Sequence, residues 1–356
     1  MNRQYNIGDK VFHNWTLTRM IGEGVFSYVF EAEREDFGRV YKAAVKIISL
    51  PKSQSEIEGL MDTGIDKDSI AKLFKDNIEE FTKSLSLMSS FKGFSNIVSY
   101  EDHIIKQQEN SIGWDMIIRM ELLSSADEFF KNKKPNINDV KKLGVDICHA
   151  LELFQRRNIL HNGVKLKNIY INEFNSYKLG GFDTICAFKD KDDSMPMVGV
   201  KVKAAPEVLR GDSYSFSADL YSLGMIMYKL LNNDRMPFLP ASPKPFTHID
   251  KKASYFRILS GEELPAPENA TKELAAIILK ACAFDPKDRY ADPMQMALEL
   301  KLCGLEEFDV VIYASPKHDS DVVLPVEPFK KTPFDDLDDY ERTVYFSPMF
   351  DIETRK

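Results

Sequence analysis

The chain has 356 residues, of which 44% are hydrophobic, so it is long enough for a two-lobed unit with a sizeable core and a tail. Its formal net charge of -8 argues against a nucleic-acid partner, and no run approaches the roughly 18 apolar residues of a membrane span. The four cysteines are scattered without a CxxC spacing, which argues against a zinc or disulfide framework. The first residues do not begin a signal peptide. We therefore expect a cytoplasmic protein with neither a nucleic-acid nor a membrane partner.

The region from Trp15 to Leu50 predicts three strands. A bend at 22–27 (GEGVFS) separates the first two strands, and Asp36-Phe37-Gly38 turns the chain into the third. A glycine-rich bend lets backbone N–H groups approach phosphates closely, although an ordinary hairpin turn has the same pattern. Alternation along 40–47 places Lys42, Ala44 and Lys46 on one face of the third strand. Lys46 then either points at a ligand or is a surface lysine on an edge strand.

The next segments predict helices around a short strand. Residues 51–70 are polar and predict an extended lead into a helix from about Asp68 to Ser90, which buries Ile78, Phe81, Leu85 and Met88. Residues 116–120 form a short apolar strand followed by Glu121-Leu122-Leu123. We expect Asn138 to cap the following helix. Its predicted buried stripe is Val140, Leu143, Ile147, Leu151 and Phe154.

Residues 161–183 (HNGVKLKNIYINEFNSYKLGGFD) predict a hairpin with polar residues at both outer ends. A tight turn at Glu173–Asn175 joins its two strands. Residues 217–231 are apolar nearly all round, which predicts a helix buried at the centre of a helical region.

Seven short motifs, in order along the chain, resemble those of eukaryotic-like Ser/Thr protein kinases. They are 22–27 for the glycine-rich loop, 43–46 (AAVK) for VAIK, 161–168 (HNGVKLKN) for HRDxKxxN, 181–183 (GFD) for DFG, 205–207 (APE), 218–224 (ADLYSLG) and 285–289 (DPKDR). The resemblance covers roughly residues 10–305 and implies an α+β, bilobal protein-kinase-like fold. The implied parts are a small β-rich N-lobe at 1–120 and a larger helical C-lobe at 121–305. A buried ion pair between Glu207 and Arg289 is implied as well.

The resemblance also implies which residues would meet ATP. In the family, the lysine at the position of Lys46 grips the α and β phosphates, and a hinge with a gatekeeper meets the adenine. The implied nucleotide-binding residues are Gly22, Gly24, Ala44, Lys46, Met120, Glu121, Leu123 and Tyr170. The family's helix glutamate, which pairs with the lysine, falls on Ser84. Glu80, one turn earlier, replaces it if the helix slides by about 5 Å; otherwise Glu79 and Glu80 form a solvated face.

Both carboxylates that define kinase chemistry are missing. Gly163 stands where the family has its catalytic Asp, and Gly181 stands where it has the Asp that binds Mg²⁺. Lys165 and Asn168 match the family, in which the asparagine holds the second Mg²⁺; the simpler interpretation of Asn168 is a turn residue. Tyr170 replaces a leucine beneath the adenine ring. Its larger ring either fills the nucleotide pocket or swings aside.

These departures favour a catalytically impaired pseudokinase that acts as a scaffold or regulator in Ser/Thr phosphosignalling. We expect ATP binding to be weak or absent, because the metal that would share the phosphate charge lacks its main ligand. The alternative is an atypical active, ATP-dependent Ser/Thr protein kinase that uses Lys46, Lys165 and Asn168. It would need a displaced carboxylate such as Asp183 or Glu80.

The last 51 residues, 306–356, carry 13 acidic and 6 basic side chains and so hold -7 of the total charge of -8. Prolines and the acidic run 335–339 leave little packable surface, which predicts disorder. Thr343 lies among acidic residues and aromatic rings. Phosphorylated there, the segment resembles acidic threonine tails that forkhead-associated domains bind, so a phosphothreonine-binding module is the expected protein partner. An ordinary solubilising tail is the alternative.

Overall fold

The computed structural model describes residues 5–12, 14–24, 27–109, 111–181, 186–187, 205–212 and 215–304. The side chains of Glu80, Ser84, Cys186 and Ala187 lie outside the described part. The described residues all belong to one compact unit, Met1–Gly304. The predictions made for Asp183, Thr343 and the tail therefore fall outside the described residues.

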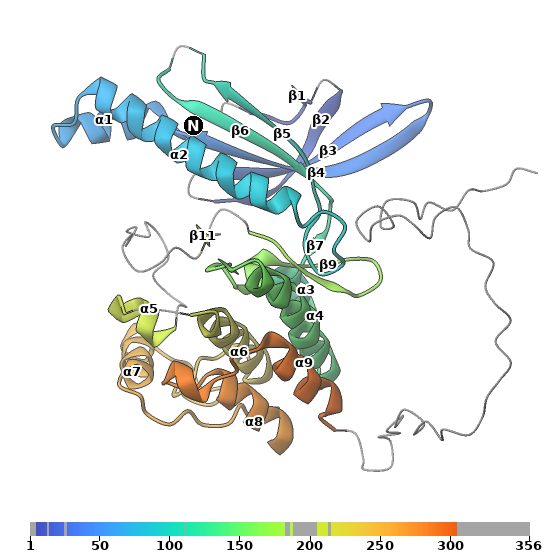
Figure 1. The fold of residues 1–356 in the computed structure, drawn as a ribbon, viewed down its shortest axis with the longest axis vertical. Helices are drawn as coiled ribbons and strands as arrows, with labels where there is room; N and C mark the ends of the chain where they lie inside the picture. Colours follow the sequence, from blue (N-terminus) through green and yellow to red (C-terminus); the bar gives the residue numbers. More distant parts are fainter. Residues whose placement is uncertain are drawn as a thin grey trace, which may run out of the picture. The chain divides into compact units, whose positions relative to one another are not determined.

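Six strands build an antiparallel sheet near the N-terminus, in the order β1-β2-β3-β4-β6-β5 (Figure 1). They are β1 Lys10–Val11, β2 Trp15–Glu23, β3 Ser27–Asp36, β4 Arg39–Leu50, β5 Tyr100–Gln107 and β6 Trp114–Met120. The three strands predicted between Trp15 and Leu50 are confirmed. Two smaller sheets follow, one in the order β10-β9-β7 and one that pairs β11 with β8. Their strands are β7 Ser124–Ser125, β8 Ile159–Leu160, β9 Ile169–Ile171, β10 Tyr177–Leu179 and β11 Cys186–Ala187.

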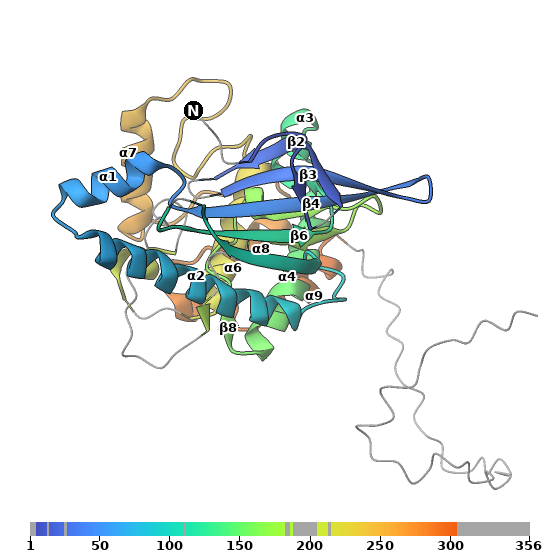
Figure 2. The same cartoon turned by 90° about the horizontal axis from the view of Figure 1, so that it is seen from above.

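The helices fall into two groups (Figures 1 and 2). The first two helices, α1 Gln54–Asp62 and α2 Lys67–Ser89, accompany the large sheet. The remaining helices form the second lobe, together with the 3-10 turns η1 Leu166–Asn168 and η3 Pro286–Asp288. They are α3 Ala126–Asn132, α4 Ile137–Arg156, α5 Pro206–Arg210, α6 Ser217–Leu231, α7 His248–Leu259, α8 Lys272–Ala281 and α9 Pro293–Leu302. The predicted α+β bilobal architecture is confirmed.

The large sheet is buried on both faces, which the alternation of β4 explains. Ala43, Val45 and Ile47 belong to a cluster with Trp15, Leu17 and Phe30 on one face. Ile48 and Leu50, which share the parity of Lys46, belong to the main core with Ile78, Leu85 and Met88 of α2. The predicted stripe of α2 is thus the surface that covers the sheet, and Lys46 shares the covered face.

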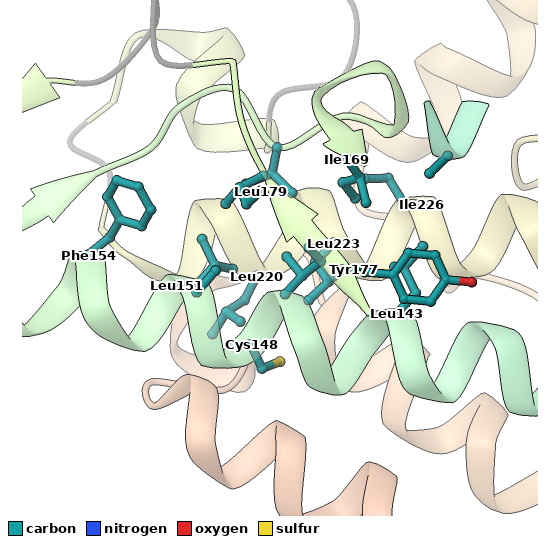
Figure 3. Packing of buried hydrophobic residues seen from close by; sticks show 14 of the residues in the cluster. Leu143, Cys148, Leu151, Phe154, Ile169, Tyr177, Leu179, Leu220, Leu223 and Ile226 are labelled. Carbon is teal, nitrogen blue, oxygen red and sulfur yellow. The ribbon is translucent and has the colours of Figure 1, made fainter. Parts of the chain in front are cut away.

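The second lobe is organised around α4 and α6, which pack against each other and against the β9–β10 hairpin (Figure 3). The stripe predicted on α4 is fully buried, from Val140 to Phe154. Helix α6 buries 13 of its 15 residues, as its all-round apolar composition predicts. Figure 3 shows Leu220, Leu223 and Ile226 of α6 facing residues of α4 and of the hairpin. The hairpin that carries the candidate site therefore rests on a rigid base.

Two local predictions were wrong. The segment 51–70 is not an extended lead, because α1 forms within it and buries Ile57. Asn136, not Asn138, caps α4: its side chain accepts the N–H of Asp139 at 2.8 Å, and Asp139 accepts the N–H of Asn136 in return. This reciprocal capping box requires an acidic residue three positions after the cap, which Asn136 has and Asn138 lacks.

Candidate nucleotide and catalytic site

The strand face expected to meet a nucleotide lies in the middle of the sheet. β4 is bordered by β3 and β6, with Lys46 paired to Val29 on one side and to Ile118 on the other. An edge position for Lys46 is therefore excluded. Ala44 is buried and pairs directly with Met120 of β6. Ala44, Lys46 and Met120 are thus brought together, as the sequence predicts.

The glycine-containing bend is held by the protein's own groups. Gly22 pairs with Val29, and the N–H of Gly24 donates to the carbonyl of Ser27 at 2.8 Å. The ammonium of Lys52 donates to the carbonyl of Gly24 and to Glu23, each at 2.9 Å. It also lies 4.1 Å from the centre of the Tyr28 ring. Lys52 lies two residues after the end of β4, so it ties that end of the strand to the bend.

The hinge residue Glu121 is bonded to a residue before β5 and to a residue of β10. Its carboxylate accepts two hydrogen bonds from Lys178 of β10, at 2.8 and 2.9 Å, and one from the backbone N–H of Ser99. Its own N–H donates to the carbonyl of Ser99 at 3.1 Å. Both side chains of the pair are largely buried, at 13% exposed for Lys178 and 24% for Glu121. The pair braces the link between the two lobes next to Leu123, which packs on the main core.

The loop that begins at His161 is held by hydrogen bonds to Asp219 of α6. The two carboxylate oxygens accept the backbone N–H groups of His161 and Asn162, at 2.8 and 3.0 Å. Burial raises the pKa of Asp219 to about 7, against the opposing effect of these two hydrogen bonds. His161 is fully buried and meets the ring of Phe154 edge-on, with the ring centroids 5.2 Å apart. His161 is therefore a core residue.

Asn168 connects the remaining parts of this loop. Its side-chain NH₂ donates to the carbonyl of Gly163, its N–H donates to the carbonyl of Lys165, and its carbonyl accepts from Gly180, all at 2.8 Å. Asn168 is 9% exposed, whereas Lys165 is exposed. It is more than a turn residue, because its side chain and backbone link two parts of the site, the loop at 163–165 and Gly180.

Gly181 has a backbone conformation and a neighbouring side chain that together disfavour any residue with a Cβ atom. Its φ is +82°, a left-handed value that side chains rarely adopt. A Cβ atom added there would lie 2.1 Å from Nδ2 and 2.2 Å from Cγ of Asn168. Contacts this short do not occur between real atoms, so the Asn168 side chain occupies the space that an aspartate at 181 would need.

Tyr170 lies against the backbone of Gly180. It is the middle residue of β9, paired with Ser125 of β7 and with Lys178 of β10. A Cβ atom on Gly180 would lie 3.0 Å from Cε2 of the tyrosine and 2.9 Å from a methyl group of Val98. The ring therefore fits because residue 180 is a glycine. That the ring fills the nucleotide pocket, and does not swing aside, stays a prediction.

The family assignment follows from this geometry and from two comparisons. The model of the protein kinase domain matches residues 15–301, which is most of the chain. The chain belongs to the protein kinase family. Serine/threonine-protein kinase PknB of Mycobacterium tuberculosis is 29% identical over 162 residues, which are 44% of this chain and 24% of that protein. Human serine/threonine-protein kinase 32B is 25% identical over 287 residues, which are 78% of this chain and 61% of that protein.

The matched regions span less than two thirds of each of these relatives. The family therefore explains the fold and its framework in this kinase-family chain, and the activity needs a separate argument. The framework includes the ion pair between Glu207 and Arg289, with N–O distances of 2.7 and 2.8 Å and both side chains at most 3% exposed. None of the described helices is both long and apolar enough to cross a membrane.

The described residues of this kinase-family site fit a magnesium-bound nucleotide poorly. Mg²⁺ prefers carboxylate and other oxygen ligands in octahedral geometry. Positions 163 and 181 supply no carboxylate, and Asn168, whose NH₂ group donates to the carbonyl of Gly163, can offer a metal only its Oδ1 atom. Within the described ranges, no group of three His, Cys, Asp or Glu side chains could hold a metal ion. Asn168 alone would be the one family metal ligand left here.

The sequence analysis did not predict three features of the site. They are the Glu121–Lys178 brace, the contact of Lys52 with the bend and the fit of Gly180 beneath Tyr170. Lys178 is 57 residues from Glu121, so no local spacing could have indicated that pair. Gly180 did carry a signal, because a second consecutive glycine before Phe182 indicates a close backbone contact.

Proposed function

We propose that this protein is a catalytically impaired kinase-family member, a pseudokinase that acts as a scaffold or regulator in Ser/Thr phosphosignalling. The observation that carries the proposal is the state of position 181. It is a glycine, its backbone is left-handed, and the Asn168 side chain fills the space that a Cβ atom would need. Loss of the acid at 163 adds to this. The site has therefore lost both a general base and the main metal ligand.

The rate contributions of the missing groups support this proposal. Positioning and neutralisation of charge by metal ions supply nearly all of the catalysis in phosphoryl transfer. A positioned general base alone contributes roughly 10²–10⁴ in rate. Two catalytic functions that act on the same transition state are removed together. We expect no measurable phosphorylation of protein substrates with Mg²⁺ or Mn²⁺.

We propose further that ATP binds weakly or not at all, and without dependence on Mg²⁺. The Tyr170 ring against Gly180 and the absent metal ligand both support this. A ligand at about 100 times its Kd stabilises a fold by roughly 2.7 kcal/mol, which thermal unfolding detects readily. The test is thermal unfolding of the purified protein with ATP, with and without Mg²⁺. A clear Mg²⁺-dependent rise in Tm would refute the proposal.

An atypical active Ser/Thr kinase is the second candidate, and the placement of Lys46 favours it. The lysine is half-buried on an internal strand beside Ala44 and Met120, where a kinase needs it. An active enzyme would use it with Lys165, Asn168 and a displaced acid, Asp183 or Glu80. Transfer of radiolabelled phosphate that disappears in Lys46→Ala distinguishes this candidate from the first.

For the partner, we propose a cytoplasmic phosphothreonine-binding module that reads Thr343. The supporting feature is in the sequence alone: one threonine among acidic and aromatic residues at 335–350. A phosphate there adds about -1.5 to -2 charge and three acceptor oxygens, which arginine-lined modules recognise. Peptides 335–350, phosphorylated or unmodified at Thr343, should retain different proteins in a pulldown. Identical sets would exclude phosphorylation-dependent docking.

A further inference from the structure

The hairpin of β3 and β4 ends in a phenylalanine that the fold itself does not need. β2 pairs with β3 no further than Glu33, and β6 pairs with β4 no further than Ala44. Residues 34–43 therefore form a two-stranded ribbon that projects beyond the sheet (Figures 1 and 2). At its tip, Phe37 is 108% exposed. Val40 and Tyr41 beside it are 56% and 44% exposed.

The backbone at the tip makes this phenylalanine costly. Asp36 pairs with Arg39, so Phe37 and Gly38 form a two-residue turn with φ values of +49° and +75°. Turns with two left-handed residues prefer Asn-Gly, because a bulky side chain at positive φ is strained by roughly 1–2 kcal/mol. The β9–β10 turn of the same chain uses Asn175 for its left-handed residue. Asparagine would therefore be the better residue at 37 for folding alone.

Two other phenylalanines with positive φ are compensated by packing. Phe12 packs against the cluster on the outer face of the sheet, and the guanidinium of Arg119 lies 5.8 Å from its ring centre. Phe238 packs against the main core, with the guanidinium of Arg257 only 3.9 Å from its ring centre. Phe37, fully exposed, has no such compensation from the fold. A strained and exposed aromatic residue points to binding.

The charges near the tip argue against a membrane or a nucleic acid as the bound surface. Arg34 pairs with Asp36, and Lys42 pairs with Glu33 and Glu31. The ribbon also carries Glu35, so it offers no basic patch to an anionic surface. Arg39 is exposed and forms no ion pair with another described residue. An apolar pocket with an acidic rim would complement this tip.

The second lobe of the same chain contains such a pocket. It has a volume of about 250 Å³ beside α7 and α8, with an apolar lining that includes Leu264, Leu279 and Phe284. Glu262 and Glu263 also line it. Glu262 is bound to Arg257, whereas Glu263 is exposed and forms no ion pair with a described residue. Both figures place the tip and α7 on opposite sides of the molecule, so the two cannot meet within one chain.

We propose that Phe37 of one copy inserts into this pocket of a second copy, with Arg39 facing Glu263. The contact is head-to-tail, so it leaves a free tip and a free pocket and generates rings or open chains. One aromatic anchor and one charge pair bury less than a standard interface of about 1,600 Å². The association is therefore weak and rises with protein concentration. It is independent of the nucleotide site.

Sedimentation of the full chain over a range of concentrations tests the proposal. The average mass should rise above the 40.8 kDa of one chain as concentration increases. Phe37→Asn should weaken self-association by about tenfold or more, as expected for loss of a buried aromatic anchor. The same variant should raise Tm, because the turn strain is relieved. The matched control is Ile249→Ser, which removes another exposed apolar residue, at 78%, from α7 and should leave association unchanged.

A charge exchange makes the test specific for the pocket. Arg39→Glu and Glu263→Arg should each weaken association, and a chain carrying both changes should regain it. A chain that stays monomeric at all concentrations overturns the proposal. So does association that is unaffected by Phe37→Asn, or a double charge exchange that fails to restore it. Binding of the monomer to anionic vesicles through Phe37 would likewise assign the tip to a membrane and overturn it.

Discussion

The acidic residues that stabilise the second lobe are retained, whereas the two acidic residues that kinase chemistry uses are replaced. Asp219 and Glu207 are both present and buried. Asp219 accepts two backbone N–H groups at 2.8 and 3.0 Å, and Glu207 accepts two bonds from the guanidinium of Arg289 at 2.7 and 2.8 Å. Positions 163 and 181 are glycines. Removing a buried structural acid leaves donors without an acceptor, whereas a catalytic acid stabilises nothing in the resting fold. The fold therefore does not depend on acids at positions 163 and 181.

The buried ion pair offers the strongest test of the structural half of this comparison. Arg289→Met removes the only guanidinium bound to Glu207 among the described residues and leaves the carboxylate buried without compensation. We expect a loss of about 3–5 kcal/mol in the free energy of unfolding, measured in urea. Arg156→Met, which breaks the surface pair with Glu152, is the control and should change little. Similar losses in the two variants would contradict the structural role.

Asp219→Asn tests the second structural acid. An asparagine offers one acceptor to two buried N–H groups, so we expect a loss of about 1–3 kcal/mol. The pKa of Asp219 is raised from 3.8 to about 7, so its favourable contribution is complete below 3.8 and is lost as the pH rises through 7. The stability difference between wild type and variant should therefore shrink from pH 4 to pH 7. A difference that grows with pH would show that the two hydrogen bonds control this carboxyl.

Position 181 tests the catalytic half. Gly181→Ala and Gly181→Asp both add a Cβ against Asn168 and at a left-handed φ, so each should lose about 1–2 kcal/mol of stability. Gly181→Asp should also fail to create Mg²⁺-dependent binding of ATP. Combining Gly181→Ala with Asn168→Ala should recover part of the loss, since the clash is removed. A Gly181→Asp protein of unchanged stability that binds Mg·ATP would refute the account of this position.

Tyr170→Leu sharpens the account of the nucleotide pocket. The smaller side chain vacates the space over Gly180, so ATP should raise Tm more in the variant than in the wild type, with or without Mg²⁺. Because no metal ligand is gained, the expected effect is smaller than the 2.7 kcal/mol or so of a saturating ligand. Tyr255→Leu, a change of the same kind in α7, is the control. An equal response of wild type and Tyr170→Leu would remove the ring as an obstacle.

Much of the fold could be predicted from the sequence, because strand alternation and helix stripes are local patterns. The face of Lys46 and the stripe of α4 are examples. The kinase motifs then gave the order of the lobes. Contacts between distant residues could not be predicted in this way. Glu121 meets Lys178 only because the hinge and the β9–β10 hairpin pack together.

Backbone geometry also could not be predicted from the sequence. The sequence places a glycine at 181 but does not say that its φ is +82° or that Asn168 fills the neighbouring space. The cap of α4 was misplaced by two residues because several asparagines compete there, and only the reciprocal bond with Asp139 decides between them.

The most direct test of the central claim is transfer of radiolabelled phosphate from ATP to a generic protein substrate, with Mg²⁺ and with Mn²⁺. Wild type and Lys46→Ala are compared at equal concentration, with an active Ser/Thr kinase as the positive control. We expect no incorporation above background in either protein, because positions 163 and 181 supply neither a base nor a metal ligand. Robust incorporation by the wild type that Lys46→Ala abolishes would contradict the claim.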